Sequence, residues 1–254
     1  MNKIPEKIRF SEPRFSLVKR CWHFIPRPLR TILIPKIKQK KYNYVISVGE
    51  SCLTAIALKE FGLRKFSGPF DWISGGYLSG RLNFILNEFD SFLDKEDIRI
   101  SNILIDTKLG TYAVNNAKNG LSLPHDFTSI NLDVSYPIVS EKYERRINRF
   151  LRIMENSSIL MVYCSKEDEG ISDECLSEFL SLILEKYRAK RIDMLIVSEL
   201  NGNKTVPNIV RINGNSDILR VRVSSKTLGS KGWFYSNYKL HSEIAQWVNT
   251  ICHL

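Results

Sequence analysis

YNYVISVGESCLTAIALKEFGL, residues 42–63, joins a strand pattern to a helix pattern through a single glycine. The apolar run Tyr44–Val48 is typical of a buried strand, and Ser51–Phe61 carries apolar residues at the spacing of a helix face. Gly49 follows the strand pattern directly, where the chain has to turn tightly. We therefore predict a strand, a turn and a helix that carries Cys52 in its first turn.

The start of this helix is a position where a nucleophile can be activated. Free backbone N–H groups and the positive end of the helix dipole favour a thiolate over a thiol, so we predict a lowered pKa for Cys52. The same N–H groups, with that of Gly49, can hold an oxyanion. Ser51 is expected to cap the helix, and it is the alternative nucleophile. A buried structural role for Cys52 is the simpler alternative, and the sequence leaves it open.

The chain continues as apolar strands that alternate with amphipathic helices. Helices are predicted at 78–89, 141–154, 173–187 and 238–251, and strands at 159–163, 192–197, 209–212 and 218–223. This alternation predicts an α/β fold, a three-layer domain in which helices flank a mainly parallel sheet. Residues 95–137 contain short apolar pieces with Gly and Pro, so we predict a loop-rich region over the carboxyl edge of the sheet, where sites usually form.

The positive charge of the chain is confined to its N-terminal part. Residues 1–42 hold twelve Lys or Arg and two Glu, whereas the other 212 residues carry 25 basic and 25 acidic side chains. We therefore predict a basic N-terminal arm, residues 1–42, and a single α/β domain of catalytic type, residues 43–254. The arm also contains aromatic and apolar residues, which suits an anionic membrane surface, and packing of the arm on the body is the alternative. The neutral body excludes nucleic acid as a partner.

The cysteines and the hydropathy indicate a cytoplasmic protein. No run of about eighteen apolar residues is present, and the N-terminus has no apolar core typical of a secretory signal. The five cysteines, at positions 21, 52, 164, 175 and 252, form no CxxC pair. We therefore predict no disulfide framework and no metal site. If the arm binds lipid, the protein is peripheral on the inner face of the cytoplasmic membrane.

A cysteine nucleophile needs a base, which is usually a histidine. His23 lies in the arm and His253 is next to the last residue, so both are weak candidates. His125 lies in the irregular central region and is followed directly by Asp126. His241 lies near the start of the last predicted helix. The residues alone leave the choice between His125 and His241 open.

Three motifs together resemble a bacterial family named "putative papain-like cysteine peptidases". The resemblance covers about residues 43–200. Its motifs are a Gly-x-x-Cys that follows a strand, a Pro-Phe-Asp-Trp block, and a His-Asp pair that precedes an Arg-rich helix. They are carried by GESCLTAIALKEFGLRKFSGPFDWI (49–73), GLSLPHDF (120–127) and EKYERRINRFLRIMENSSILMVYCSK (141–166).

The resemblance implies roles for individual residues. Cys52 would be the nucleophile and His125 the general base, with Asp71 or Asp126 orienting the imidazole. Apart from the resemblance, the charges of Arg64 and Lys65 make them candidates for binding an anionic substrate or a cofactor phosphate, and solvated charges at the end of the Cys52 helix are the alternative. The implied substrate is a peptide, and a likeness to proteins of capsule and lipopolysaccharide clusters implies an acyl or polysaccharide substrate instead. No cofactor is expected, and an acyl-CoA donor is expected only for acyl transfer.

Two alternatives remain at this point. The stretch at 49–51 also resembles the start of the SGNH hydrolase family, which implies Ser51 or Cys52 as nucleophile and His241 as base. Polysaccharide O-acyltransferases have similar strand–Gly–nucleophile starts. A papain-like domain carries its His on an antiparallel sheet, whereas the pattern of this chain favours a parallel one. The second alternative is a non-catalytic assembly protein that binds a membrane surface through its basic arm.

Overall fold

The computed structural model describes residues 40–165, 171–200, 206–212, 216–224 and 232–251. These residues belong to one compact unit, Ile37–Leu254. The helices are α2 (Cys52–Glu60), α3 (Leu78–Leu86), the 3-10 turn η3 (Lys95–Asp97), α4 (Leu132–Met154), α5 (Asp173–Tyr187) and α7 (Gly232–Ile251). The strands are β1 (Tyr44–Ser47), β2 (Ile98–Asp106), β3 (Thr111–Asn116), β4 (Ser158–Ser165), β5 (Arg191–Leu200), β6 (Val206–Ile212) and β7 (Ser216–Ser224).

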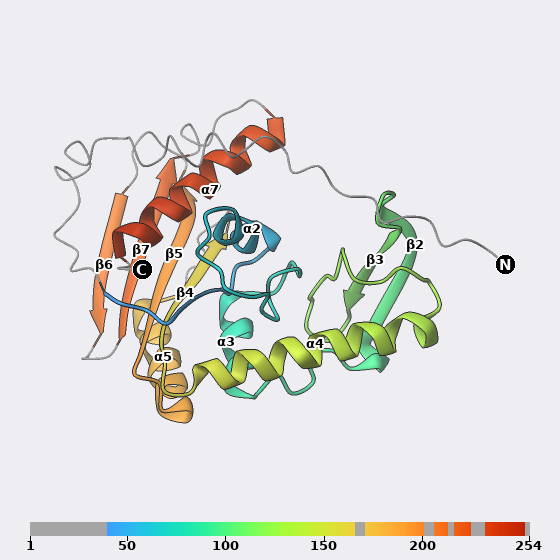
Figure 1. The fold of residues 1–254 in the computed structure, drawn as a ribbon, viewed down its shortest axis with the longest axis horizontal. Coiled ribbons are helices and arrows are strands. Elements are labelled where there is room, and N and C mark those ends of the chain that lie inside the picture. Colours follow the sequence, from blue (N-terminus) through green and yellow to red (C-terminus); the bar gives the residue numbers. More distant parts are fainter. Residues whose placement is uncertain (1–39, 166–170, 201–205, 213–215, 225–231, 252–254) are drawn as a thin grey trace. The chain divides into compact units, whose positions relative to one another are not determined.

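The centre of the fold is a five-stranded sheet in the order β1-β4-β5-β7-β6 (Figure 1). Neighbouring strands from β1 to β7 are parallel, and β6 runs antiparallel to β7 at the edge. The prediction of a mainly parallel sheet is therefore confirmed. Continuous apolar strands such as β4 favour this arrangement, because both of their faces are covered.

The two faces of the sheet are covered by different helices, which gives the predicted three layers. Alternate residues of a strand point to opposite faces. Ile159, Met161 and Tyr163 of β4 belong to the core shared with α3, α4 and α5. The intervening Leu160 and Val162 are equally buried but lie outside that core, on the face that α2 and α7 cover (Figure 1).

The region 95–137 differs from the prediction of loops, because it contains a β-hairpin. Strands β2 and β3 pair antiparallel in a separate two-stranded sheet (Figure 1). Their register shifts between Ile100 and Leu104 and again before Asp106. Such irregularities add unpaired residues and disturb the alternation of apolar and polar side chains by which a strand is predicted.

Helix α4 begins nine residues before the predicted start at Glu141. The Oδ1 of Asn131 caps the helix by accepting the N–H of Asp133 at 2.9 Å. Pro137 lies inside the helix, although proline is usually a sign that a helix ends. The longer helix reaches from the hairpin to β4 and carries the predicted Arg-rich stretch (Figure 1).

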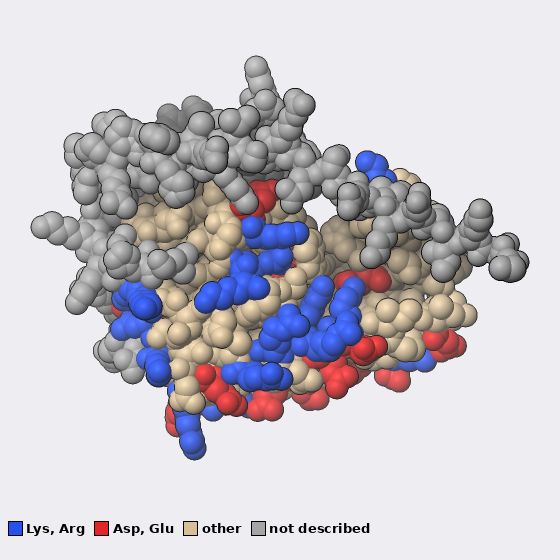
Figure 2. All heavy atoms as spheres, viewed as in Figure 1, with Lys and Arg blue, Asp and Glu red and all other residues tan. Residues whose placement is uncertain are grey.

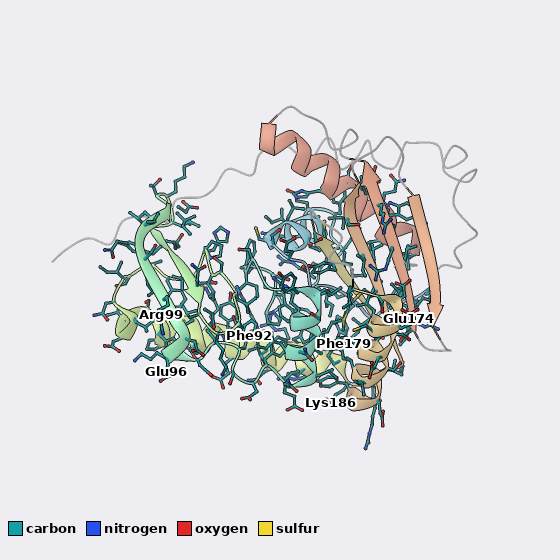
Figure 3. All side chains as sticks on the ribbon, turned by 180° about the vertical axis from the view of Figure 1, so that it is seen from behind. Phe92, Glu96, Arg99, Glu174, Phe179 and Lys186 are labelled. Carbon is teal, nitrogen blue, oxygen red and sulfur yellow. The ribbon has the colours of Figure 1, made fainter. Side chains whose placement is uncertain are left out.

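Aromatic rings fill the space between α3 and α4. Phe92 lies near the middle of the molecule in Figure 3, with its ring 5.0 Å from that of Phe84 and 5.3 Å from that of Phe89. Phe70, in the Pro-Phe-Asp-Trp block, lies 5.2 Å from Phe89. Each of these aromatic pairs adds about 0.5–1.5 kcal/mol beyond the area it buries. The block is thereby fixed to the core on one side.

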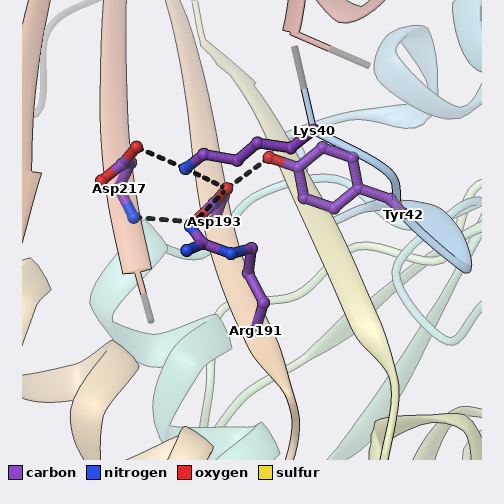
Figure 4. A network of polar contacts seen from close by, with 5 residues as sticks. All are labelled: Lys40, Tyr42, Arg191, Asp193 and Asp217. Atoms are coloured by element: carbon purple, nitrogen blue, oxygen red, sulfur yellow. Dashed lines mark hydrogen bonds and ion pairs between the residues drawn. The ribbon is translucent and has the colours of Figure 1, made fainter. Parts of the chain in front are cut away.

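A buried carboxylate ties the start of the described chain to the sheet (Figure 4). Asp193 of β5 accepts hydrogen bonds from the Tyr42 hydroxyl, from Lys40 Nζ at 2.9 Å and from Arg191 Nη1 at 3.1 Å. The backbone N–H of Asp217 in β7 donates to the same carboxylate at 2.7 Å. The last residues of the predicted arm therefore pack against the sheet, while residues 1–39 lie outside the described part.

No described helix has both the length and the apolar character needed to span a bilayer.

Candidate functional site

The site is built where β1 ends, at the carboxyl edge of the sheet. The ladder between β1 and β4 continues past Ser47, because Val48 N–H donates to Val162 O at 2.9 Å and Glu50 N–H donates to Cys164 O at 3.3 Å. The chain then turns into α2, whose N-cap is Ser51, as predicted. Ser51 Oγ accepts the N–H of Leu53 at 3.4 Å. This places Cys52 at the first position of the helix.

Gly49 is needed because a side chain in α2 occupies the space beside it. A Cβ added to Gly49 would lie 2.1 Å from Oγ1 of Thr54 and 2.7 Å from its Cβ. Thr54 is fully buried, so it has little room to move aside. The close approach of the turn to the helix therefore depends on a glycine.

Replacing Gly49 by alanine should lower the free energy of unfolding by about 1–3 kcal/mol through this overlap. Gly80 in α3 is a matched control, because a Cβ added there meets nothing within 4 Å. Gly80→Ala should instead be neutral or stabilise the helix by up to about 1 kcal/mol. Urea unfolding of both variants measures the difference. Equal stability of the two variants would contradict the assigned clash.

The thiol of Cys52 is half-buried, and this changes its acidity. Burial raises the pKa of Cys52, and the backbone hydrogen bond at the start of α2 opposes this effect only in part. The predicted lowering of this pKa is therefore wrong in direction. The helix terminus acts as expected, but desolvation of the thiolate outweighs it. The resting group is a thiol that has to lose its proton to a base during reaction.

One segment, Asp71–Gly76, connects the Cys52 junction to the loop that carries His125. On one side Gly75 N–H donates to Glu50 O at 3.0 Å. On the other side Ser74 and Ser122 exchange two backbone hydrogen bonds of 2.8 and 2.9 Å. The segment thus holds both chains of the candidate pair in one neighbourhood.

His125 is partly buried beside the Trp72 ring. The two rings are perpendicular, with centroids 6.2 Å apart. The guanidinium of Arg64 lies over the Trp72 ring, 5.6 Å from its centroid. Within the described part of the chain, no hydrogen bond joins Cys52 to His125. The structure links their two chain segments through Asp71–Gly76, which is hydrogen-bonded to Glu50 and to Ser122.

Asp71 is bound to other groups than His125. Its buried carboxylate pairs with Arg64 and accepts the N–H of Gly68 at 2.9 Å. Burial raises the pKa of Asp71 to about 6, while the Arg64 charge acts in the opposite direction. This ion pair fixes the turn before Trp72. Arg64 is thereby placed next to the site, as a candidate anion ligand should be.

Asp126 points toward α4. It pairs with Lys142 and accepts the hydroxyl hydrogen bond of Tyr143 at 2.7 Å. Burial and the nearby Asp126 charge raise the pKa of Tyr143 well above its ordinary value, so the phenol stays protonated and remains a donor. Asp126 thus fastens the His125 loop to the helix.

His241 lies at the opposite end of α2 from Cys52. Its Nδ1 is 2.8 Å from Oε2 of Glu60, the last residue of the helix. At 1.5 Å per residue, eight residues place Glu60 about 12 Å along the helix axis from Cys52. The arrangement that pairs Ser51 or Cys52 with His241 is therefore not formed.

Arg81 is a residue of this site that the sequence reasoning missed. It is fully buried, and its Nη2 donates to Gly75 O at 2.6 Å and to Glu50 O at 3.2 Å. Its guanidinium also lies 5.3 Å from the centroid of Phe70. The sequence feature that could have indicated its role is a single arginine within the otherwise mainly apolar helix LSGRLNFIL. Arg81 clamps the residue two positions before Cys52 to the connecting segment.

Comparison with known proteins assigns the larger part of the chain to a family. A family model described as "Putative papain-like cysteine peptidase (DUF1796)" matches residues 43–201. The "Uncharacterized protein R408" of Acanthamoeba polyphaga mimivirus is 28% identical over 186 residues, which cover 68% of this chain and 78% of that protein. No solved structure matches the chain. Since the family model spans more than half of its residues, the chain belongs to the family described as "Putative papain-like cysteine peptidase (DUF1796)".

Proposed function

We propose that the protein is a cysteine hydrolase or acyl-transfer enzyme in which Cys52 is the nucleophile and His125 the general base. The observation that carries this proposal is the Asp71–Gly76 segment, which is hydrogen-bonded both to the Cys52 junction and to the His125 loop. Family membership supports a cysteine-based hydrolase. The position of His241 at the far end of α2 favours His125 as the base.

The reaction begins with proton transfer, because the resting thiol has a raised pKa. His125 accepts the thiol proton as Cys52 Sγ forms a bond to the acyl carbon of the substrate. The free N–H groups at the start of α2 stabilise the oxyanion. The imidazolium then gives its proton to the leaving group, and a thioester remains on Cys52. Water, or a sugar hydroxyl of a surface polysaccharide, attacks this thioester and releases the acyl product.

In this proposal, Asp71 and Asp126 hold other parts of the site in place. Asp71 holds Arg64 and the turn before Trp72, and Asp126 fastens the His125 loop to α4. Both are positioning residues, since their carboxylates bind other groups than the imidazole. Arg81 has the same kind of role for the backbone before Cys52.

Acylation of individual cysteines tests the proposal. With a p-nitrophenyl ester at neutral pH, we expect Cys52 to gain the acyl group before Cys164 and Cys175, as measured by mass spectrometry of the tryptic peptides. Cys164 is buried and Cys175 is half-buried at the start of α5, so they are internal controls. Ester hydrolysis should stop in Cys52→Ala and persist in Cys175→Ala. Acylation of all three cysteines at similar rates would refute a nucleophilic role for Cys52.

A further inference from the structure

Four cationic side chains beside the candidate site each lie over an aromatic ring. The distances from the cation to the ring centroid are 5.6 Å for Arg64 on Trp72, 5.2 Å for Lys65 on Tyr44, 5.1 Å for Arg146 on Tyr143 and 5.7 Å for Arg149 on Phe66. We call these four cations the basic face. Contact with a ring restricts a long side chain, and it leaves the N–H groups of a cation that has no carboxylate partner available to a ligand.

The basic face is continuous, although its members come from two segments of the chain. The centroids of the Tyr44 and Phe66 rings lie 6.0 Å apart. The rings that Lys65 and Arg149 contact are therefore neighbours. The other two cations, Arg64 and Arg146, both act electrostatically on Asp71. Figure 2 shows Lys and Arg side chains, in blue, gathered across the middle of the face that is turned to the viewer. One end of the face therefore reaches Trp72, whose ring contacts His125.

Three of the four cations of this face have no carboxylate partner among the described residues. Asp71 is fully buried and pairs with Arg64. In the described residues, Lys65, Arg146 and Arg149 form no ion pair, and Lys65 Nζ donates to Asn43 O at 2.8 Å instead. The Nη1 atom of Arg146 is buried, and no acceptor among these residues satisfies it. Because a buried donor without an acceptor is costly, Arg146 would gain from a rearrangement that brings its guanidinium to an acceptor on a ligand.

We propose that the basic face binds the phosphate groups of the substrate that Cys52 attacks, an inference that rests on the proposed function. Arg146 and Arg149 follow each other at i, i+3 on α4, about 4.5 Å along the axis, so neighbouring groups of one ligand can reach both. Guanidinium groups bind phosphate with two parallel hydrogen bonds. Several uncompensated cations in a row favour a multiply charged ligand over a single carboxylate. The phosphate belongs either to a soluble ester or to a phospholipid headgroup.

Binding measurements on the full chain test this inference and distinguish the two sources. Binding of pyrophosphate, measured by isothermal titration calorimetry, tests for a soluble phosphate ester. Cosedimentation with vesicles of phosphatidylcholine and phosphatidylglycerol, against phosphatidylcholine alone, stands for the headgroup. In Arg146→Gln/Arg149→Gln we expect binding in one of the two assays to weaken about tenfold or more, because charged hydrogen bonds are lost. Lys65→Gln, an exposed change that spares the fold, should weaken it in the same assay.

Arg145→Gln is the matched control, because Arg145 lies beside Arg146 on the same helix but pairs with Glu141. It should alter binding by less than about twofold. The basic residues 1–42 are unchanged in every variant, so their own affinity for anions cancels in the comparison. Absence of binding in both assays, or an equal loss in Arg145→Gln, would overturn the inference.

The two proposals can fail separately. Cys52→Ala removes the proposed nucleophile but none of the basic face, so it should bind the anion as tightly as the unchanged protein. If Cys52 is not acylated while binding depends on Arg146 and Arg149, the catalytic proposal fails and phosphate recognition remains. If Cys52 is acylated and no anion binds, the substrate of the enzyme carries no phosphate.

Discussion

Acylation of Cys52 in His125→Ala should be slower than in the unchanged protein by about 10²-fold or more at neutral pH. The reason is the raised pKa of Cys52, which leaves the thiol protonated in the resting protein. A raised pKa lowers the fraction of thiolate that can react without a base, so the reaction depends more strongly on proton transfer. The rate of p-nitrophenol release, with Cys52 acylation followed by mass spectrometry, measures the effect.

His241→Ala provides the control for this loss. His241 is bound to Glu60 at the far end of α2, so its removal should change the acylation rate by less than about twofold while lowering stability. The pH profile adds a second readout, because His125→Ala should shift the rise in rate to higher pH. The assignment of the base would be wrong if His241→Ala caused the larger loss of rate.

The largest loss of stability is expected for Asp193→Ala, at about 3–5 kcal/mol. The carboxylate is buried and is shared by Tyr42, Lys40 and Arg191, with the Asp217 backbone as a fourth donor. Its removal takes away an acceptor that the Tyr42 hydroxyl, Lys40 and Arg191 share, whereas Lys40 keeps its ion pair with Asp217. Since the cations are only partly buried, they can turn toward water, which places the loss near the lower end of this range.

The variant Asp217→Asn separates the contribution of the buried Asp193 carboxylate from that of a partly buried ion pair. The Asp217 side chain is 29% exposed and pairs with Lys40, so its change should cost only about 0–1 kcal/mol. Urea unfolding at neutral pH measures both variants. A cost for Asp193→Ala no greater than that for Asp217→Asn would show that the network of Figure 4 contributes little to the fold.

The sequence predicted elements well where local signals mark their ends. Helix α5 has the predicted bounds, because Ser172 caps its start and Arg188 ends it in a left-handed conformation. The turn from β1 into α2 was predicted for the same kind of reason, with Gly49 and Ser51 as its markers. The beginning of α4 was missed, since Pro137 indicates a break that the helix does not make.

The neighbourhood of the site could not be derived from local patterns. Trp72 and His125 are far apart in the chain, and their contact depends on the pairing of Ser74 with Ser122. The acidity of Cys52 was predicted from the helix terminus alone, which is a local property. Its burial depends on how distant segments pack around it, and that contribution is the larger one.

The protonated state of the Cys52 thiol has a consequence for the chemical survival of the protein. Peroxide attacks thiolates rather than thiols, and it converts them to sulfenic acid and then to irreversible higher acids. A cysteine that remains protonated until a substrate and a base meet it is a poor target for such damage. The burial that raises the pKa of Cys52 therefore also slows its oxidation by peroxide.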